Sequence, residues 1–145
     1  MGLLNFFGWG SNKQEAIQAL ESAKKASQSL NIDVSIAAHE NWLTRLETYT
    51  AGHGCDHLNP SDVASDCKCD LGKWIYSDGE KHLGQYAAFQ DLKATHKMFH
   101  FKASSIVSLT QAGRKKAAEK ELAGDIQKMS LKIRKRLEDL KNIEE

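Results

Sequence analysis

Proline is almost absent from the sequence, and so is the strict alternation of polar and β-branched residues that marks a half-buried strand. Pro60 is the only proline among 145 residues. Apolar residues instead recur at every third or fourth position through most of the chain, a spacing that places them on one face of a helix. The sequence therefore predicts an all-α protein.

The chain also lacks an excess of charge and a long hydrophobic run. Twenty Lys and Arg residues oppose 19 Asp and Glu residues, giving a formal charge of +1, so no strong field draws nucleic acid or an anionic membrane. The apolar start, MGLLNFFGWG, is too short for a membrane span. It also lacks the basic flank and the cleavage site of a signal peptide. We expect a cytoplasmic protein with no nucleic-acid partner and no membrane insertion.

Cysteine is scarce, and its number is odd. With three cysteines, one thiol stays unpaired in any disulfide scheme, which favours a reducing compartment and thiols that serve as ligands or redox groups. The length suits one domain that forms a core without crosslinks. The predicted organisation is an apolar lead-in over residues 1–11 and a single helical domain over residues 12–145.

Local signals divide the domain into helices. Ser11 and Gln14 have the spacing of a capping box, so a helix should begin near residue 12, and a second apolar stripe begins at Ile32. Further helices are predicted over residues 80–112 and after Gly113. Helices joined in this order pack most simply as an antiparallel four-helix bundle.

The segment between the second and third of these helices holds the turn-forming residues. We predict a long connection over residues 51–68 with a helical turn after Pro60. A short helix is expected over residues 71–76, closed by the Ser-Asp-Gly sequence at 77–79. This short segment follows Cys69, one of the candidate ligands.

Three histidines fall on the predicted apolar stripes. His96 and His100 are four residues apart on one helix, so both rings project from the same face, and His39 lies on another helix. A lone buried histidine is usually satisfied by a carbonyl or a water, but three together require partners. With Cys69 they form a nitrogen and sulfur set that suits tetrahedral zinc better than the carboxylates of a hemerythrin-like iron site.

A second cluster of candidate ligands lies in the predicted connection. It has the pattern H-x-C-x-H followed by C-x-C and comprises His53, Cys55, His57, Cys67 and Cys69. Its spacing fits no common zinc ribbon or finger. Both metal sites use Cys69, so the residues alone leave this alternative open.

Three motifs together resemble the chemoreceptor zinc-binding domain family. They are AHENWLTRL at residues 38–46, CDLGKW at 69–74 and LKATHKMFHFKA at 92–103. The family pattern is a histidine three residues before a tryptophan, then C-x-L-G-x-W, then H-x-x-x-H. The resemblance covers about residues 32–110, and three linked motifs are a more specific signal than any one alone.

The resemblance implies that one zinc ion binds to four side chains: His39, Cys69, His96 and His100. It also identifies Trp42 and Trp74 as the family tryptophans, which can wall the site with apolar surface. Gly72 would allow the cysteine segment to approach a helix closely.

The resemblance further implies a role in bacterial signalling and chemotaxis. Members of the family occur in chemoreceptors, in diguanylate cyclases and as stand-alone proteins, and they respond to zinc or to oxidants such as hypochlorous acid. This chain is similar to a stand-alone member, for which we expect a homodimer and a chemoreceptor, diguanylate cyclase or kinase as partner.

Other functions fit the sequence less well. Zinc with four protein ligands has no open position for water or substrate, so we expect no enzyme. A phosphotransfer protein is of similar size, but the H-x-x-K-G signature is missing. A structural scaffold, in which zinc serves stability alone, is the third interpretation.

Overall fold

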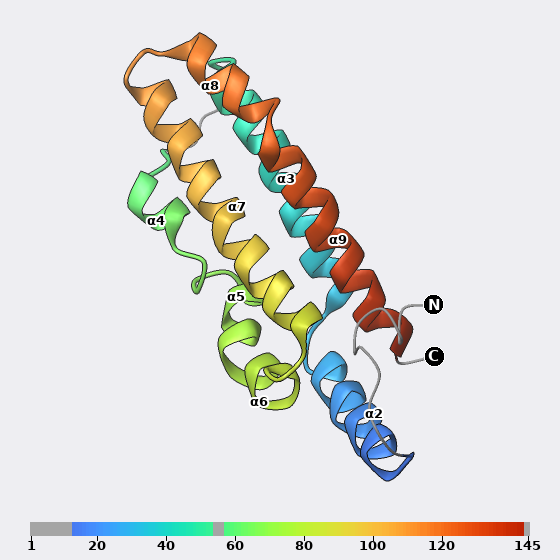
Figure 1. Ribbon diagram of the computed structural model, residues 1–145. Coiled ribbons are helices and arrows are strands. Elements are labelled where there is room, and N and C mark those ends of the chain that lie inside the picture. Colours follow the sequence, from blue (N-terminus) through green and yellow to red (C-terminus); the bar gives the residue numbers. More distant parts are fainter. Residues whose placement is uncertain (1–12, 54–56, 144–145) are drawn as a thin grey trace.

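The regular structure in the described part of the chain is helical throughout, which confirms the all-α prediction. The computed structural model describes residues 13–53 and 57–143, so the lead-in predicted for residues 1–11 lies outside it (Figure 1). The elements are α2 (Lys13–Gln28), α3 (Ile32–Thr50), α4 (Pro60–Ala64), α5 (Asp70–Trp74), a π-helical turn η1 (Ile75–Gly79), α6 (Glu80–Leu83), α7 (Ala87–Gln111), α8 (Lys115–Leu122) and α9 (Asp125–Ile143).

The two helices that carry the histidines run in the same direction. The hydroxyl of Thr50, at the end of α3, lies 3.3 Å from that of Thr110, near the end of α7. Between α3 and α7 the chain runs antiparallel to α7 through the short elements α4, α5, η1 and α6. The Ser104 hydroxyl donates to the carbonyl oxygen of Pro60 in α4 at 2.8 Å, and α5 and α6 lie beside the first half of α7 (Figure 1). The segment that carries Cys69 is thereby packed against α7, the helix of His96 and His100.

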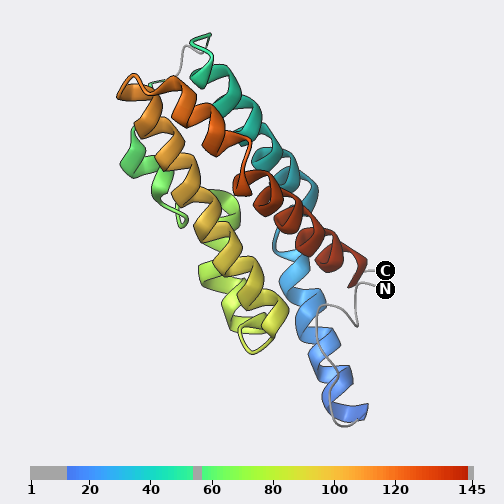
Figure 2. The same ribbon diagram turned by 45° about the horizontal axis from the view of Figure 1, so that its top comes forward.

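The last two helices run back along the bundle. α9 is antiparallel to α3, because Arg134 pairs with Glu40 at 3.0 Å and Lys141 pairs with Asp33 at 2.9 Å. α2 lies beyond the first turn of α3, and the N-terminal part of α2 projects away from the other helices (Figures 1 and 2). Up and down columns therefore alternate along the chain, and the second column is built from the short elements α4, α5, η1 and α6.

Several helix starts agree with the sequence. α3 begins at Ile32, where the Asn31 side chain accepts the backbone N–H of Val34 at 3.1 Å and so caps the first turn. Pro60 opens α4 as its first residue, a position where its missing N–H costs no hydrogen bond. Gly52, just beyond α3, has a φ of +82°, which favours glycine at a helix end.

Three predicted boundaries were wrong. The Ser-Asp-Gly sequence at 77–79 does not end a helix, because η1 continues it into α6. Gly79 is needed for packing, since a Cβ there would lie 2.8 Å from the Phe89 ring. The predicted helix over 80–112 is broken between Leu83 and Ala87, and a turn at residues 123–124 divides the predicted last helix into α8 and α9.

The core runs the length of the bundle and draws on most of its elements. Its largest fully buried side chains are Leu46, Leu71, Ile75, Leu83, Phe89, Leu92, Phe99, Ile106, Ile126, Ile133 and Leu137. The three histidines predicted to face the interior lie within this apolar surrounding. None of the helices in the described ranges combines the length and the hydropathy that a membrane span requires.

Candidate metal centre

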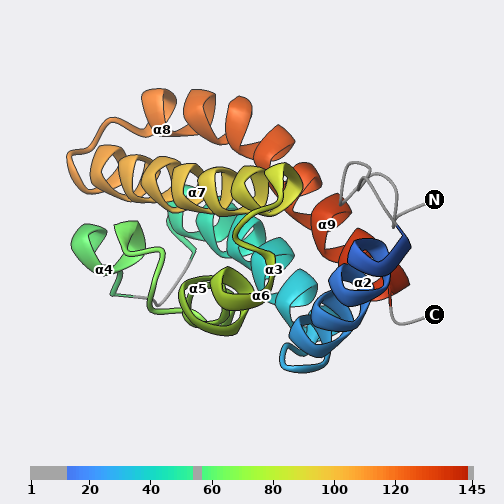
Figure 3. The ribbon, with the colours of Figure 1, turned by 60° about the horizontal axis from the view of Figure 1, so that its bottom comes forward.

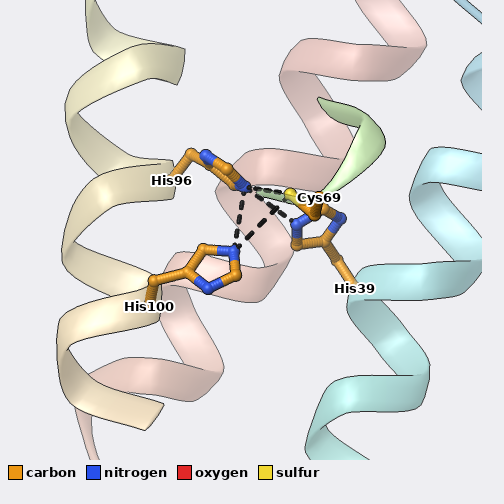
Figure 4. Close-up of side chains that lie close together, drawn as sticks. All are labelled: His39, Cys69, His96 and His100. Atoms are coloured by element: carbon orange, nitrogen blue, oxygen red, sulfur yellow. Dashed lines mark hydrogen bonds between the residues drawn. The ribbon is translucent and has the colours of Figure 1, made fainter. Parts of the chain in front are cut away.

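Helices α3 and α7 bring three imidazoles together in the core. His39, His96 and His100 are exposed by 3%, 0% and 3%. His96 and His100 stand one turn apart on α7, and their rings are 4.6 Å apart between centroids. His39 approaches from α3, as the close-up shows (Figure 4). Burial on this scale requires each ring nitrogen to find a partner inside the protein.

Cys69 lies at the start of α5, in the second column of the bundle. Cys69 is the N-cap residue of α5, and its sulfur accepts the backbone N–H of Gly72 at 3.3 Å. Seen from the end of the bundle, α5 and α6 lie beside α3 and α7 (Figure 3). The cap therefore aims the sulfur at the histidines while leaving the side chain partly accessible.

The four donor atoms form a compact group. The Nε2 atom of His96 lies 3.0 Å from that of His39 and 3.1 Å from that of His100. The Cys69 sulfur lies 3.3 Å from His96 Nε2 and 3.8 Å from His100 Nε2. Around a tetrahedral zinc ion, donor atoms are separated by about 3.3 to 3.6 Å, given the usual bond lengths. The group has the size of a zinc coordination shell, and all four atoms lie within 4.8 Å of one another.

Backbone carbonyls fix the tautomers of two rings. His39 Nδ1 is 2.9 Å from the carbonyl oxygen of Ser35, and His100 Nδ1 is 2.9 Å from that of Val63. A carbonyl oxygen only accepts, so each Nδ1 carries the proton and each Nε2 presents a lone pair. Both lone pairs face the centre of the cluster. This outer support is typical of histidines that bind metal.

His96 cannot satisfy its neighbours with a proton. Its Nε2 faces the lone pairs of His39 and His100 and the sulfur of Cys69, while its buried Nδ1 has no hydrogen-bond partner among the described residues. One proton on Nε2 can be donated to only one imidazole, and the proton of the Cys69 thiol reaches the other, His100, only across a weak 3.8 Å contact. A divalent cation at the centre would accept electron pairs from all four donors. The residues present therefore fit a zinc ion.

Burial sets the charge of each ligand. Desolvation lowers the pKa of His39 and of His100. For His96, desolvation and the neighbouring His39 and His100 together lower the pKa to about 2. The imidazoles are therefore neutral at neutral pH, which is the form that binds metal. Desolvation raises the pKa of the Cys69 thiol, so a bound cation would have to favour the thiolate.

We expect acid to destabilise the metal-free protein. Because burial lowers the folded-state pKa of these histidines, the unfolded chain binds protons that the folded chain does not once the pH falls below about 6.5. His96 alone should lower the free energy of unfolding by about 2 kcal/mol between roughly pH 7 and pH 5. Urea denaturation in the presence of a chelator measures the effect. His96→Leu is the matched control and should show a shallower pH dependence, and an unchanged slope would contradict the prediction.

The loop cluster is not assembled in the part of the chain that the structure describes. Cys67 is exposed and its sulfur lies 3.3 Å from the Ser65 hydroxyl. His53 and His57 are also exposed, and Cys55 lies outside the described residues. Cys69 lies instead with the three buried histidines, which is the only group of potential ligands found among the described residues.

The two tryptophans occupy different places. The Trp42 ring lies 6.3 Å from that of His100, with the Arg45 guanidinium 4.3 Å above it. Trp74 packs on Phe89, with the ring centroids 5.9 Å apart. The structure thus puts Trp42 beside the imidazoles.

Trp74 connects the cysteine segment to α2. Its indole N–H lies 3.0 Å from both the carbonyl oxygen of Ala26 and the hydroxyl of Ser29. A second link joins α6 to α2, where His82 Nδ1 lies 3.0 Å from the Ser22 hydroxyl. The segment that carries Cys69 is therefore tied to the end of α2.

Sequence reasoning did not identify two groups that orient the histidine rings, the backbone carbonyls of Ser35 and Val63. The Ser35 carbonyl could have been found, because it lies one helical turn before His39. Val63 carries no such signal, since its position depends on how α4 packs on α7.

Gly72 is required by a close approach of the backbone, which comes from the turn at residues 66–67 and not from a helix as predicted. A Cβ at this position would lie 1.8 Å from the Asp66 carbonyl oxygen, so Gly72→Ala must displace the segment that aims Cys69. We expect zinc affinity to fall by about 10- to 100-fold, the usual effect of disturbing the support of a ligand. Competition with a chromogenic chelator measures this. Gly124→Ala, where the nearest atom is 3.3 Å away, is the control, and equal affinities for the two variants would refute the prediction.

Comparisons with known proteins agree with this geometry. The family model described as the chemoreceptor zinc-binding domain matches residues 39–107. The matched segment starts at the α3 histidine and includes the cysteine and both α7 histidines. Searches of curated proteins and of solved structures found no match.

Proposed function

Residues 39–107 of this chain belong to the chemoreceptor zinc-binding domain family, and from this membership we propose that the protein is a zinc-dependent regulator in bacterial signalling. The cofactor is Zn²⁺. The proposed ligands are the four convergent side chains, His39, Cys69, His96 and His100.

The arrangement around His96 Nε2 carries the proposal. Two imidazole lone pairs and one sulfur converge on this atom at 3.0, 3.1 and 3.3 Å, and even with the thiol proton shared with His100 at 3.8 Å the buried His96 Nδ1 has no partner among the described residues. Bound zinc would neutralise these donors and hold the Cys69 sulfur as a thiolate. Four protein ligands leave no coordination position for a substrate, so we propose a regulatory and not a catalytic site.

The fold suggests how occupancy would be transmitted. Cys69 caps the helical segment formed by α5, η1 and α6, and Trp74 in that segment holds the end of α2. Zinc that binds the sulfur together with the α3 and α7 histidines would fix this segment against the bundle. Loss of zinc would free its first turn and weaken the hold on α2. The proposed output is therefore a change in the position or mobility of α2.

The Cys69 sulfur could also receive an oxidant. A thiolate attacks hypochlorous acid, and the net reaction gives a sulfenic acid and chloride, with two electrons passing from sulfur to chlorine. A sulfenic acid is a poorer ligand than a thiolate, so zinc would leave. Zinc concentration and oxidation would thus act on the same atom.

The remaining proposals concern the setting of the protein. We propose a cytoplasmic, single-domain protein over residues 12–145 that acts as a homodimer. Its partner would be a chemoreceptor, a diguanylate cyclase or a kinase, as is typical of the family. A phosphotransfer role is disfavoured by the histidines of the site, because rings exposed by 3% or less cannot reach a phosphoryl donor.

A structural scaffold is the second candidate, favoured by the burial of the three histidines. Hydrogen–deuterium exchange with and without zinc separates the two functions. A regulator should lose protection mainly in α5, α6 and α2 when zinc is removed, while α7 and α9 keep theirs. Uniform loss of protection along the whole bundle would instead identify zinc as a purely structural ion.

A further inference from the structure

A second thiol lies beside the proposed zinc ligand and has no role in the site. Cys67 precedes Cys69 by two residues, with only Lys68 between them. Its side chain is exposed, whereas that of Cys69 is partly buried. The contact found for the Cys67 sulfur is the Ser65 hydroxyl at 3.3 Å, and a thiol forms only weak hydrogen bonds.

The backbone brings the two cysteines within reach of each other. A disulfide requires Cα atoms about 4.4 to 6.8 Å apart, and two residues of fully extended chain span roughly 7 Å. The chain forms a turn at residues 66–67 and bends at 68–69, which shortens this distance.

Gly72 lies next to both cysteines. Its N–H donates to the Cys69 sulfur at 3.3 Å. A Cβ added to it would lie 3.0 Å from the Cys67 Cα. The absence of a side chain at this position therefore lets the Cys67 backbone and the Cys69 sulfur pack against the same residue, so that rotation of the exposed Cys67 side chain is what remains to bring the two sulfurs together.

We propose that Cys67 is a resolving thiol that forms a disulfide with Cys69 after an oxidant has converted Cys69 to a sulfenic acid. This inference rests on the oxidant response proposed above. The Cys67 sulfur attacks the Cys69 sulfur, the S–O bond breaks, and the leaving hydroxyl combines with the thiol proton to give water. The two electrons lost by the cysteine pair have already reduced the oxidant.

The disulfide would make zinc release reversible. A sulfenic acid that meets more oxidant advances to sulfinic acid, which ordinary thiols do not reduce. A disulfide stops this reaction, and because Cys67 is exposed a thiol reductant can reach the disulfide and reduce it. Reduction would return the Cys69 thiol and restore the zinc ligands.

Trypsin offers a direct assay, because it cleaves between the two cysteines at Lys68. The zinc-loaded full chain is treated with one equivalent of hypochlorous acid, blocked with iodoacetamide and digested. The expected product is a crosslinked pair of peptides, residues 46–68 joined to residues 69–73. Cys55 shares the first peptide, so the Cys55→Ser variant must still give the pair. Released zinc is measured with a chromogenic chelator in the same samples.

Cys67→Ser provides the decisive comparison, since this exposed position should tolerate serine. The variant should release zinc as the wild type does but give no crosslinked pair. After excess oxidant and then a thiol reductant, it should recover at most about a tenth of the zinc that the wild type recovers, because Cys69 is over-oxidised.

The outcomes distinguish the two proposals. Zinc release without a crosslink between residues 67 and 69 overturns this inference and leaves the oxidant response intact. A crosslink that involves Cys55, or equal zinc recovery in Cys67→Ser and wild type, also overturns it. If the oxidant releases no zinc and oxidises no thiol, the oxidant response itself fails and this inference fails with it.

Discussion

Cys69→Ser is expected to lower zinc affinity by more than about 100-fold, since even the outer support of a ligand contributes 10- to 100-fold. A serine hydroxyl does not ionise near neutral pH and binds zinc weakly compared with a thiolate. The three histidines would remain, but the ion would lose its only anionic ligand. Metal analysis of protein purified without added zinc, followed by competition titration with a chelator, measures the change.

Cys67→Ser is the matched control for this substitution. It makes the same chemical change two residues away, on a side chain that is exposed and outside the cluster. It should keep one zinc ion per chain with unchanged affinity. If Cys67→Ser lost zinc and Cys69→Ser retained it, the loop cluster of His53, Cys55, His57 and Cys67 would be the metal site.

Removal of zinc is expected to lower the melting temperature by roughly 8 to 16 °C. A ligand present at 1,000 times its dissociation constant stabilises the folded state by about 4 kcal/mol, and each kcal/mol shifts the melting temperature of a domain of this size by roughly 2 to 4 °C. Part of this stabilisation comes from the metal-free state, in which two imidazole lone pairs face His96 Nε2 in a buried site. Thermal unfolding followed by circular dichroism, with and without a chelator, tests this.

A variant that cannot bind zinc shows whether the chelator acts through the site. The melting temperature of Cys69→Ser should already be low and should barely change when the chelator is added. Equal melting temperatures for the zinc-loaded and zinc-free wild type would show that the ion contributes little to folding.

Much of the helical structure follows from local signals in the sequence. The apolar stripe that begins at Ile32 and the helix-opening Pro60 mark where α3 and α4 begin, and the four-residue spacing of His96 and His100 requires only one helix to place both rings together. These features depend on neighbours along the chain. Sequence reasoning identifies them because the interactions involved connect residues that are close together in the sequence.

The rest depends on contacts between distant segments. Gly79 resembles a turn residue in the sequence, yet it serves close packing against Phe89, and the helix continues through it. Spacing alone could not decide whether Cys69 joins the histidines or the loop cluster, and the family resemblance supplied that pairing. The carbonyl of Val63 orients His100 only because α4 packs on α7, which no local pattern records.

X-ray absorption at the zinc edge on the purified protein reports directly on the atoms around the metal. The geometry of α3, α5 and α7 predicts one zinc ion with a single sulfur at about 2.3 Å and three imidazole nitrogens at about 2.0 to 2.1 Å. A shell with two sulfurs, or one of oxygens with no sulfur, would contradict the assignment of Cys69 and the three histidines as the ligands.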